Sequence, residues 1–393
     1  MPRLHPARGV DRPALGSQAK PADDGSAHVG RSRHHPTKRR LARPDPAEAA
    51  EEAGLVYTTD LEPGIRRVRK GKAFIYRDPA GKLVRDAVTL NRIQSLVIPP
   101  AWKHVWITTH PRGHLQATGR DKRGRKQPLY HPRWRVVRDA NKFDRMVGFA
   151  RKLPRIRRRV ARDMRHDGLP REKVVATIVK LLELTFARIG NEEYARENRS
   201  FGLTTLRDRH VDVRGATVRF LFTGKSGREI QVALTNKRVA RVIKRCEDLP
   251  GQMLFQYLDD QGERRVVTSD DVNQYLRDAT GEDYTAKDFR TWAGTVLAAN
   301  ALRELANFES EIEAKRNVIS GIDSVARKLG HTRAVCRRAY VHPAVIEAYM
   351  DRSLEDALRG NVAKTFLRLK ADESAVVALL KRSMVRKATK PRK

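Results

Sequence analysis

The sequence predicts an α+β protein with a small β-rich N-terminal domain and a larger, mainly α-helical domain that contains a β-hairpin. Short runs of β-branched and aromatic residues, separated by Gly and Pro, begin near residue 55. Beyond about residue 136, apolar residues recur at helical spacing, and a hairpin pattern interrupts them between residues 217 and 234. With 393 residues, 40% of them hydrophobic, the chain is long enough for two or three domains with ordinary cores.

The chain is strongly basic, with 81 Lys and Arg against 46 Asp and Glu and a formal net charge of +35. Such a field attracts polyanions, so nucleic acid is the expected partner. Two cysteines, Cys246 and Cys336, are too few for a disulfide framework or a zinc cluster and indicate a reducing compartment. Because no apolar run approaches the ~18 residues of a membrane span, we expect a cytoplasmic, nucleoid-associated protein that binds no membrane.

Residues 1–54 are expected to form a basic disordered tail. The first 45 residues carry six Pro and ten Lys or Arg against four Asp or Glu, and they show no hydrophobic period. The segment 31–43 is the most basic part, and we interpret it as a loosely held arm that binds phosphates. A localisation signal is the alternative interpretation of the same segment.

Residues 55–135 are predicted to form the β-rich domain, with strands at 56–59, 65–69, 73–76 and 105–109. A second feature of this region is the stretch 116–130, which interleaves Lys and Arg with Gly, a Gln and a Tyr. Cations can hold phosphates there while the amide and the phenol reach bases or sugars. A solvated hairpin tip would explain the charge of the stretch but not its continuation, since 19 Lys or Arg stand against five acids between Pro111 and Pro170. The candidate DNA contacts are Arg120, Lys122, Arg123, Arg125, Lys126, Gln127 and Tyr130.

Residues 136–393 are predicted to form the mainly helical domain. Residues 173–188 have apolar side chains at helical spacing and predict a core helix whose last turn carries Arg188. Strand-like segments then enclose a turn that presents Lys225 at the tip of a hairpin. Gly224-Lys225-Ser226 does not complete a phosphate-binding loop, because Arg219 stands where that motif has its first Gly, so no ATP site is expected.

The next predicted helices cover 235–247, 270–279 and a long segment that ends near residue 305. Thr285 can cap the long helix together with Asp288, which places Lys287 and Arg290 in its first turns. A helix N-terminus attracts anions, so these two cations are candidate phosphate ligands. The segment 354–393 is predicted to be an amphipathic helix with basic ends, and we expect no catalytic role for it.

Tyr340 is the candidate nucleophile. It falls on a predicted short helix that is entered through Gly330 and His331, contains three arginines and is stopped by Pro343. Neighbouring cations stabilise a phenolate and also bind the anion that it attacks, and a phosphodiester fits that description. The alternative is a tyrosine that covers a hydrophobic helix face beside solvated arginines.

Arg188, Lys225, Arg290, His331 and Tyr340, in this order and in these local settings, resemble the catalytic pentad of the type IB DNA topoisomerases in their compact bacterial and poxvirus form. Tyr194, four residues past Gly190, matches a DNA-contacting position of that family, as do Gln127 and Tyr130. The resemblance covers roughly residues 56–350, and its matching segments are 119–127, 186–190, 222–225, 287–291, 329–332 and 337–340.

The resemblance implies a role for each of the five residues. Tyr340 would attack a DNA phosphorus, Arg188 and Arg290 would hold the phosphate, His331 would add a hydrogen bond, and Lys225 would protonate the leaving sugar oxygen. It also implies a 3′-phosphotyrosyl intermediate and relaxation of positive and negative supercoils without ATP, metal or other cofactor. The implied fold is of the tyrosine recombinase and topoisomerase IB type, a monomer that forms a clamp around duplex DNA.

The chain departs from the poxvirus pattern at Asn191 and Glu193, where that form has lysines, so a strong preference for a short target sequence is not implied. Two alternatives remain. A tyrosine recombinase has the same order of catalytic residues, but it typically carries His three residues before the second Arg, where this chain has Lys287. A non-enzymatic DNA-binding protein is the other alternative, although an inactive descendant would be free to lose Tyr340.

Overall fold

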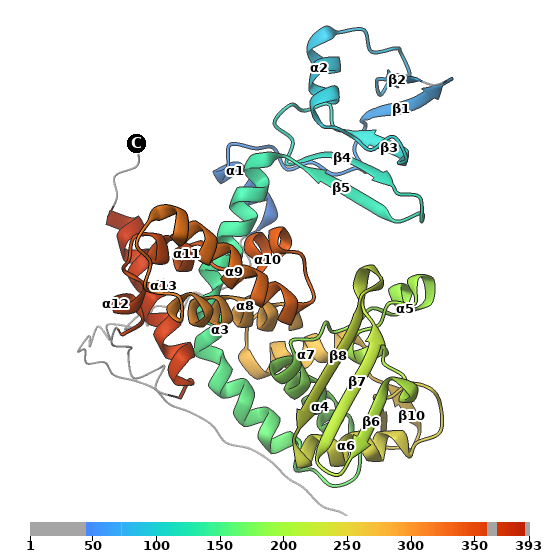
Figure 1. Cartoon of the computed structure of the whole chain (residues 1–393). Helices are drawn as coiled ribbons and strands as arrows, with labels where there is room; N and C mark the ends of the chain where they lie inside the picture. Colours follow the sequence, from blue (N-terminus) through green and yellow to red (C-terminus); the bar gives the residue numbers. More distant parts are fainter. Residues whose placement is uncertain (1–44, 72, 360–367, 390–393) are drawn as a thin grey trace, which may run out of the picture. The chain divides into compact units, whose positions relative to one another are not determined.

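The protein's structure is a computed structural model that describes residues 45–71, 73–359 and 368–389, without the side chains of residues 138–141 and 387–389. Its N-terminal region contains a five-stranded antiparallel sheet with the strand order β2-β1-β3-β4-β5 (Figure 1). One face of the sheet buries a small cluster that includes Ile65, Ile107 and Ala117 and is completed by Ile93 from helix α2. The elements are β1 (Ile65–Lys70), β2 (Ala73–Arg77), α2 (Ala87–Ser95), β3 (Lys103–Ile107), β4 (Leu115–Arg120) and β5 (Lys126–Tyr130).

Two N-terminal predictions need correction. The predicted strand 56–59 is wrong, because only Val56 makes a single bridge, with Gly113. The predicted disordered tail extends too far, because helix α1 (Pro46–Glu52) packs Ala50 against Leu55 and Trp134. A small apolar cluster therefore stabilises residues 46–55, whereas the basic segment 31–43 lies outside the described residues. Helix α2 was not predicted.

The helical region is organised around helix α3, which begins at Pro132 with His131 as its N-cap. The predicted domain boundary at 135/136 therefore falls inside a continuous helix, and the division into domains remains a prediction. The buried face of α3 contributes to one large hydrophobic core together with α4, α7 and α8. These helices are α3 (Pro132–Asp163), α4 (Arg171–Thr185), α7 (Ser269–Thr280) and α8 (Ala286–Arg303).

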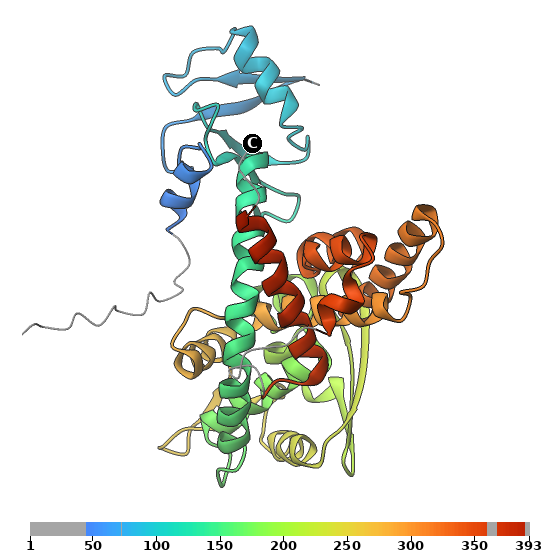
Figure 2. The same cartoon turned by 90° about the vertical axis from the view of Figure 1, so that its left-hand side faces the viewer.

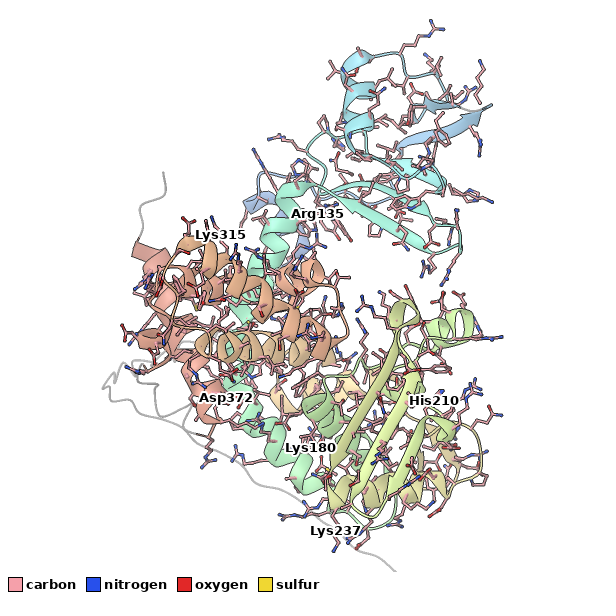
Figure 3. All side chains as sticks on the ribbon, viewed as in Figure 1. Arg135, Lys180, His210, Lys237, Lys315 and Asp372 are labelled. Carbon is pink, nitrogen blue, oxygen red and sulfur yellow. The ribbon has the colours of Figure 1, made fainter. Side chains whose placement is uncertain are left out.

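The predicted hairpin is confirmed and belongs to a three-stranded antiparallel sheet, β6-β7-β8. Alternate side chains of the middle strand, among them Val218 and Phe220, are buried against the helices. His210, labelled in Figure 3, lies just before this sheet and packs its ring against Phe201 at a centroid distance of 4.5 Å. The elements of this part are α5 (Glu192–Asn198), β6 (Val211–Arg214), β7 (Thr217–Thr223), β8 (Glu229–Thr235), α6 (Lys237–Glu247), β9 (Gln256–Leu258) and β10 (Arg264–Val266).

Helix α8 is the central element of the C-terminal half, with contacts to α3, α4, α9, α10, α11 and α13. Figures 1 and 2 show α13 alongside α3, and the two helices are in contact. The predicted single helix 354–393 is wrong, because α12 ends at Leu358 and α13 starts at Ala371. No described helix is long and apolar enough to cross a membrane. The remaining helices are α9 (Glu311–Leu329), α10 (Arg333–Tyr340), α11 (Pro343–Met350), α12 (Leu354–Leu358) and α13 (Ala371–Thr389).

Candidate active site

Arg188 lies three residues beyond the end of α4, which corrects the prediction that the last helical turn carries it. The helix ends because Phe186 takes up left-handed backbone angles, with φ at 56°, a conformation that is strained for a bulky residue. The extended segment that follows is bonded to the chain near residue 203. Leu203 N–H donates to Arg188 O at 2.9 Å. This hydrogen bond fixes the main chain from which the Arg188 side chain projects.

A close crossing of two glycines makes this arrangement possible. A Cβ atom on Gly202 would lie 2.5 Å from the backbone nitrogen of Gly190, which no side chain tolerates. Gly190 itself has a φ of 106°, a conformation open mainly to glycine. The backbone therefore requires glycine both at position 190 and at position 202.

Lys225 lies in the short turn between β7 and β8, as predicted. The neighbouring Ile230 side chain packs between the hairpin and the loop before α10, because added Cβ atoms on Gly224 and Gly330 would lie 2.8 and 3.2 Å from it. Lys225 Nζ lies 5.4 Å from the centre of the Tyr194 ring. The hairpin tip is thus packed against the segment that leads to His331.

Arg290 lies in the second turn of α8, and only 5% of it is exposed. The predicted cap is confirmed, since the Asp288 carboxylate accepts both the Thr285 N–H, at 2.8 Å, and the Thr285 hydroxyl. One guanidinium nitrogen of Arg290 donates to Leu329 O at 2.6 Å, whereas its Nε has no partner within the described part of the chain. Burial lowers the pKa of Arg290, but arginine remains charged near neutral pH. Arg290 therefore presents an unsatisfied donor next to Tyr340.

Helix α9 ends at Gly330, whose φ of 63° is left-handed, and His331 follows directly. Arg188 Nη2 lies 2.9 Å from His331 Nε2. The His331 and Tyr340 rings are 4.7 Å apart between centroids, and the guanidinium carbon of Arg290 lies 5.3 Å from the centre of the Tyr340 ring. Three segments that are distant in the sequence therefore meet around the phenol.

Four of the five predicted catalytic side chains line one cavity of about 400 Å³, and the fifth, His331, adjoins it through its contact with Arg188. Two larger hollows, of about 690 and 770 Å³, contain none of the five. Burial, followed by the charges of Arg188 and Arg290, lowers the pKa of His331 to about 3. The imidazole is therefore neutral at physiological pH. The predicted catalytic side chains that line the cavity are Arg188, Lys225, Arg290 and Tyr340.

The predicted DNA contacts are found in two groups. Lys287 and Tyr194 line the same cavity of about 400 Å³. The others belong to the β4–β5 hairpin, where Asp121 accepts hydrogen bonds from Arg125, at 2.8 Å, and from Gln127, at 3.0 Å. Arg125 also donates to the Tyr194 hydroxyl at 3.2 Å. The remaining hairpin residues are Arg120, Lys122 and Arg123, which are exposed, Lys126, which pairs with Asp60 at 2.6 Å, and Tyr130, which is half-buried near the His114 ring.

The sequence interpretation missed three residues around Tyr340. Lys142 of α3 donates to Ala339 O, one residue before Tyr340, and Gly294 and Thr295 of α8 contact the Tyr340 main chain. Lys142 belongs to no motif, and its distance in the sequence conceals the contact. Gly294 did give a signal, since glycine inside a helix is unfavourable by about 1 kcal/mol relative to alanine and needs a reason.

Comparison with known proteins identifies the family. The family model described as "Eukaryotic DNA topoisomerase I, catalytic core" matches residues 131–363, and "Bacterial DNA topoisomerase IB, N-terminal domain" matches residues 73–121. The DNA topoisomerase 1B of Acanthamoeba polyphaga mimivirus is 31% identical over 298 residues, which cover 74% of this chain and 89% of the relative. The DNA topoisomerase 1B of vaccinia virus (strain Copenhagen) is 24% identical over 321 residues, covering 77% of this chain and 97% of the relative.

A short helix that ends with a tyrosine beside two arginines, on a mixed α/β fold with an N-terminal sheet, fits an enzyme that acts on DNA. The chain belongs to the type IB DNA topoisomerase family. It is an isomerase that acts on DNA topology.

Proposed function

We propose that this chain relaxes positive and negative supercoils by cutting one DNA strand transiently through Tyr340 and resealing it, without ATP or metal. The observation that carries the proposal is the single cavity that collects Arg188, Lys225, Arg290 and Tyr340, with His331 bonded to its edge. These residues come from a loop, a hairpin turn and three different helix ends or starts. Random placement of five such residues would not bring them together.

The scissile phosphate would bind between the two arginines. A guanidinium has only donors, so the His331 nitrogen that faces Arg188 accepts a hydrogen bond in the DNA-free protein. A phosphate oxygen is a stronger acceptor and would replace it. The N–H of the neutral imidazole is then on the other ring nitrogen, Nδ1, so the released ring would turn or exchange tautomer to donate that N–H to the phosphate. Arg290 Nε, which is buried and unpartnered within the described residues, would supply a further charge-assisted bond.

The chemistry is a transesterification. The Tyr340 oxygen forms a bond to phosphorus as the bond from phosphorus to the 5′ oxygen breaks, and the phenolic proton passes to water. Lys225 donates a proton to the leaving oxygen. Because one phosphate ester replaces another of similar energy, the 5′ hydroxyl can attack the 3′-phosphotyrosyl bond and reseal the strand without ATP. The free 5′ end swivels in between and releases supercoils.

The proposal extends to the whole chain. Residues 55–135 would form one side of a clamp around duplex DNA, and residues 136–393 the catalytic side, in a monomer that works on nucleoid DNA. The exposed cations Arg120, Lys122 and Arg123 of the β4–β5 hairpin support contact with phosphates. Gln127 and Tyr130 would reach DNA only after leaving their contacts within the hairpin.

The test of the proposed nucleophile is the substitution Tyr340→Phe. It should retain DNA binding but form no covalent protein–DNA adduct, because the phenolic oxygen that joins the phosphorus is absent. Denaturing-gel detection of an adduct on end-labelled duplex measures this. Tyr349→Phe is the matched control, since Tyr349 is buried and its hydroxyl contacts Asn317 rather than the cavity. An adduct in Tyr340→Phe would move the nucleophile elsewhere.

A further inference from the structure

The main chain of Tyr340 is tied to α8 by one buried hydroxyl. Thr295 is completely buried, and its Oγ1 donates to Tyr340 O at 3.1 Å and accepts the His342 N–H at 3.0 Å. Tyr340 is the last residue of α10, and His342 is the N-cap of α11. A single side chain therefore joins the end of one helix to the start of the next at the position of the proposed nucleophile.

Gly294 brings the same helix into direct contact with Tyr340. A Cβ atom on Gly294 would lie 2.7 Å from both the Cβ and the carbonyl oxygen of Tyr340. The position is inside α8 and does not require left-handed backbone angles, so conformational freedom does not explain the glycine. The close approach of the Tyr340 main chain explains it.

Arg290 lies one helical turn before these two residues. Four residues of α-helix span about 6 Å and have almost no internal freedom. The same rigid turn therefore carries the proposed phosphate ligand Arg290 at one end and the supports of the Tyr340 main chain at the other. This geometry sets the distance between Arg290 and the Tyr340 main chain independently of the loops on either side.

We propose that Thr295 and Gly294 are positioning residues for the nucleophile, which hold the Tyr340 main chain at a fixed distance from Arg290 while the phenol alone turns toward phosphorus. The proposal rests on the proposed role of Tyr340. Its physical basis is that strand transfer needs reacting atoms placed to within a fraction of an ångström, and an error of about 1 Å can cost about 100-fold in rate. DNA binding does not depend on that distance.

Thr295→Val tests the hydroxyl, because valine keeps the shape and removes both hydrogen bonds. We expect the single-turnover cleavage rate to fall about 10- to 100-fold, with DNA affinity, measured in the Tyr340→Phe background, unchanged. Thr295→Ser restores the hydroxyl and should cleave within about threefold of the wild type. Thr177→Val is the matched control, since Thr177 is equally buried and its hydroxyl donates to Lys173 O of its own helix, at 2.8 Å.

Gly294→Ala separates positioning from stability. Alanine favours the helix over glycine by about 1 kcal/mol, so a loss of cleavage in a variant that stays folded would come from displacement of Tyr340. The inference is overturned if Gly294→Ala cleaves at the wild-type rate, or if Thr295→Val is no slower than Thr177→Val or is not rescued by serine. If Thr295→Val does not fold, the cleavage rates of Gly294→Ala and Thr295→Ser test the inference instead. Cleavage by Tyr340→Phe would instead refute the proposed nucleophile.

Discussion

His331 shows how strongly the surroundings of one residue limit its chemistry. Its imidazole is partly buried beside Arg188 and Arg290, and burial together with these charges lowers its pKa to about 3. A further positive charge is therefore not added beside the two arginines at physiological pH. In the proposed mechanism His331 therefore serves the phosphate as a neutral hydrogen-bond donor, and the neighbouring arginines carry the charge.

The lowered pKa of His331 predicts a pH dependence of stability. An unfolded histidine titrates near pH 6.5, so between that pH and about 3 the unfolded chain binds a proton that the folded chain does not. Stability therefore falls as the pH drops below about 6.5. His331→Gln removes this contribution, so its melting temperature should decrease less between pH 7 and pH 5 than that of the wild type.

Thermal unfolding of both proteins at the two pH values measures the difference. His114, His131 and His210 also have lowered pKa values because of burial, but they are present in both proteins and cancel. If the melting temperatures of the two proteins decreased by the same amount between pH 7 and pH 5, His331 would be protonated in the folded protein at pH 5.

The proposed role of Lys225 as proton donor predicts rescue by a better leaving group. Lys225→Ala should slow cleavage of ordinary DNA by about 10²- to 10⁴-fold, the usual contribution of a general acid. A substrate with a 5′ sulfur at the cleavage site should restore the rate, because a thiolate leaves without a proton. Single-turnover cleavage of the two substrates measures the ratio. Lys237→Ala is the control, because Lys237, labelled in Figure 3, is an exposed lysine. If Lys225→Ala slowed cleavage of both substrates equally, Lys225 would not be the proton donor.

At the scale of elements, α13 packs against α8 and stabilises it. Glu373 of α13 accepts two hydrogen bonds from Arg157 of α3, at 2.6 and 2.8 Å, and lies 3.4 Å from the indole nitrogen of Trp292 of α8. Asp372, labelled in Figure 3, adds a bond from Asn300 at 3.3 Å. The C-terminal helix thus stabilises α8, although the sequence indicated no role for it.

Glu373→Ala should therefore destabilise the protein without changing its chemistry. Removing one partner of a buried ion pair leaves Arg157 with Glu183 alone, and we expect a loss of about 2 kcal/mol in the free energy of unfolding. Urea unfolding measures the loss. Glu311→Ala, which breaks an exposed pair with Lys315, is the control and should have no measurable effect. Equal stabilities of the two variants would contradict this account of α13.

At the scale of the whole molecule, transesterification requires no energy source. The purified protein should relax positively and negatively supercoiled plasmid without ATP and in the presence of EDTA, because each cleaved ester is conserved as a phosphotyrosine. Agarose-gel analysis of the topoisomers measures relaxation, and Tyr340→Phe is the inactive control. Loss of relaxation in EDTA would show that a metal takes part.

Increasing salt should weaken DNA binding, because the net charge of +35 acts through displaced counterions. The positions of cations along the sequence predicted the hairpin β4–β5 as a DNA contact, but not that Asp121 and Asp60 partly neutralise it.

The sequence by itself determined the local elements that carry chemistry, since caps, turns and hydrophobic periods are short-range signals. The hairpin around Lys225, the cap at Thr285 and the short helix that ends at Tyr340 were all predicted from such signals. Only the tertiary structure decided where Arg188 leaves α4, why α8 carries Gly294, and that Thr295 holds the Tyr340 main chain. These features depend on contacts between residues far apart in the chain, and no local pattern records them.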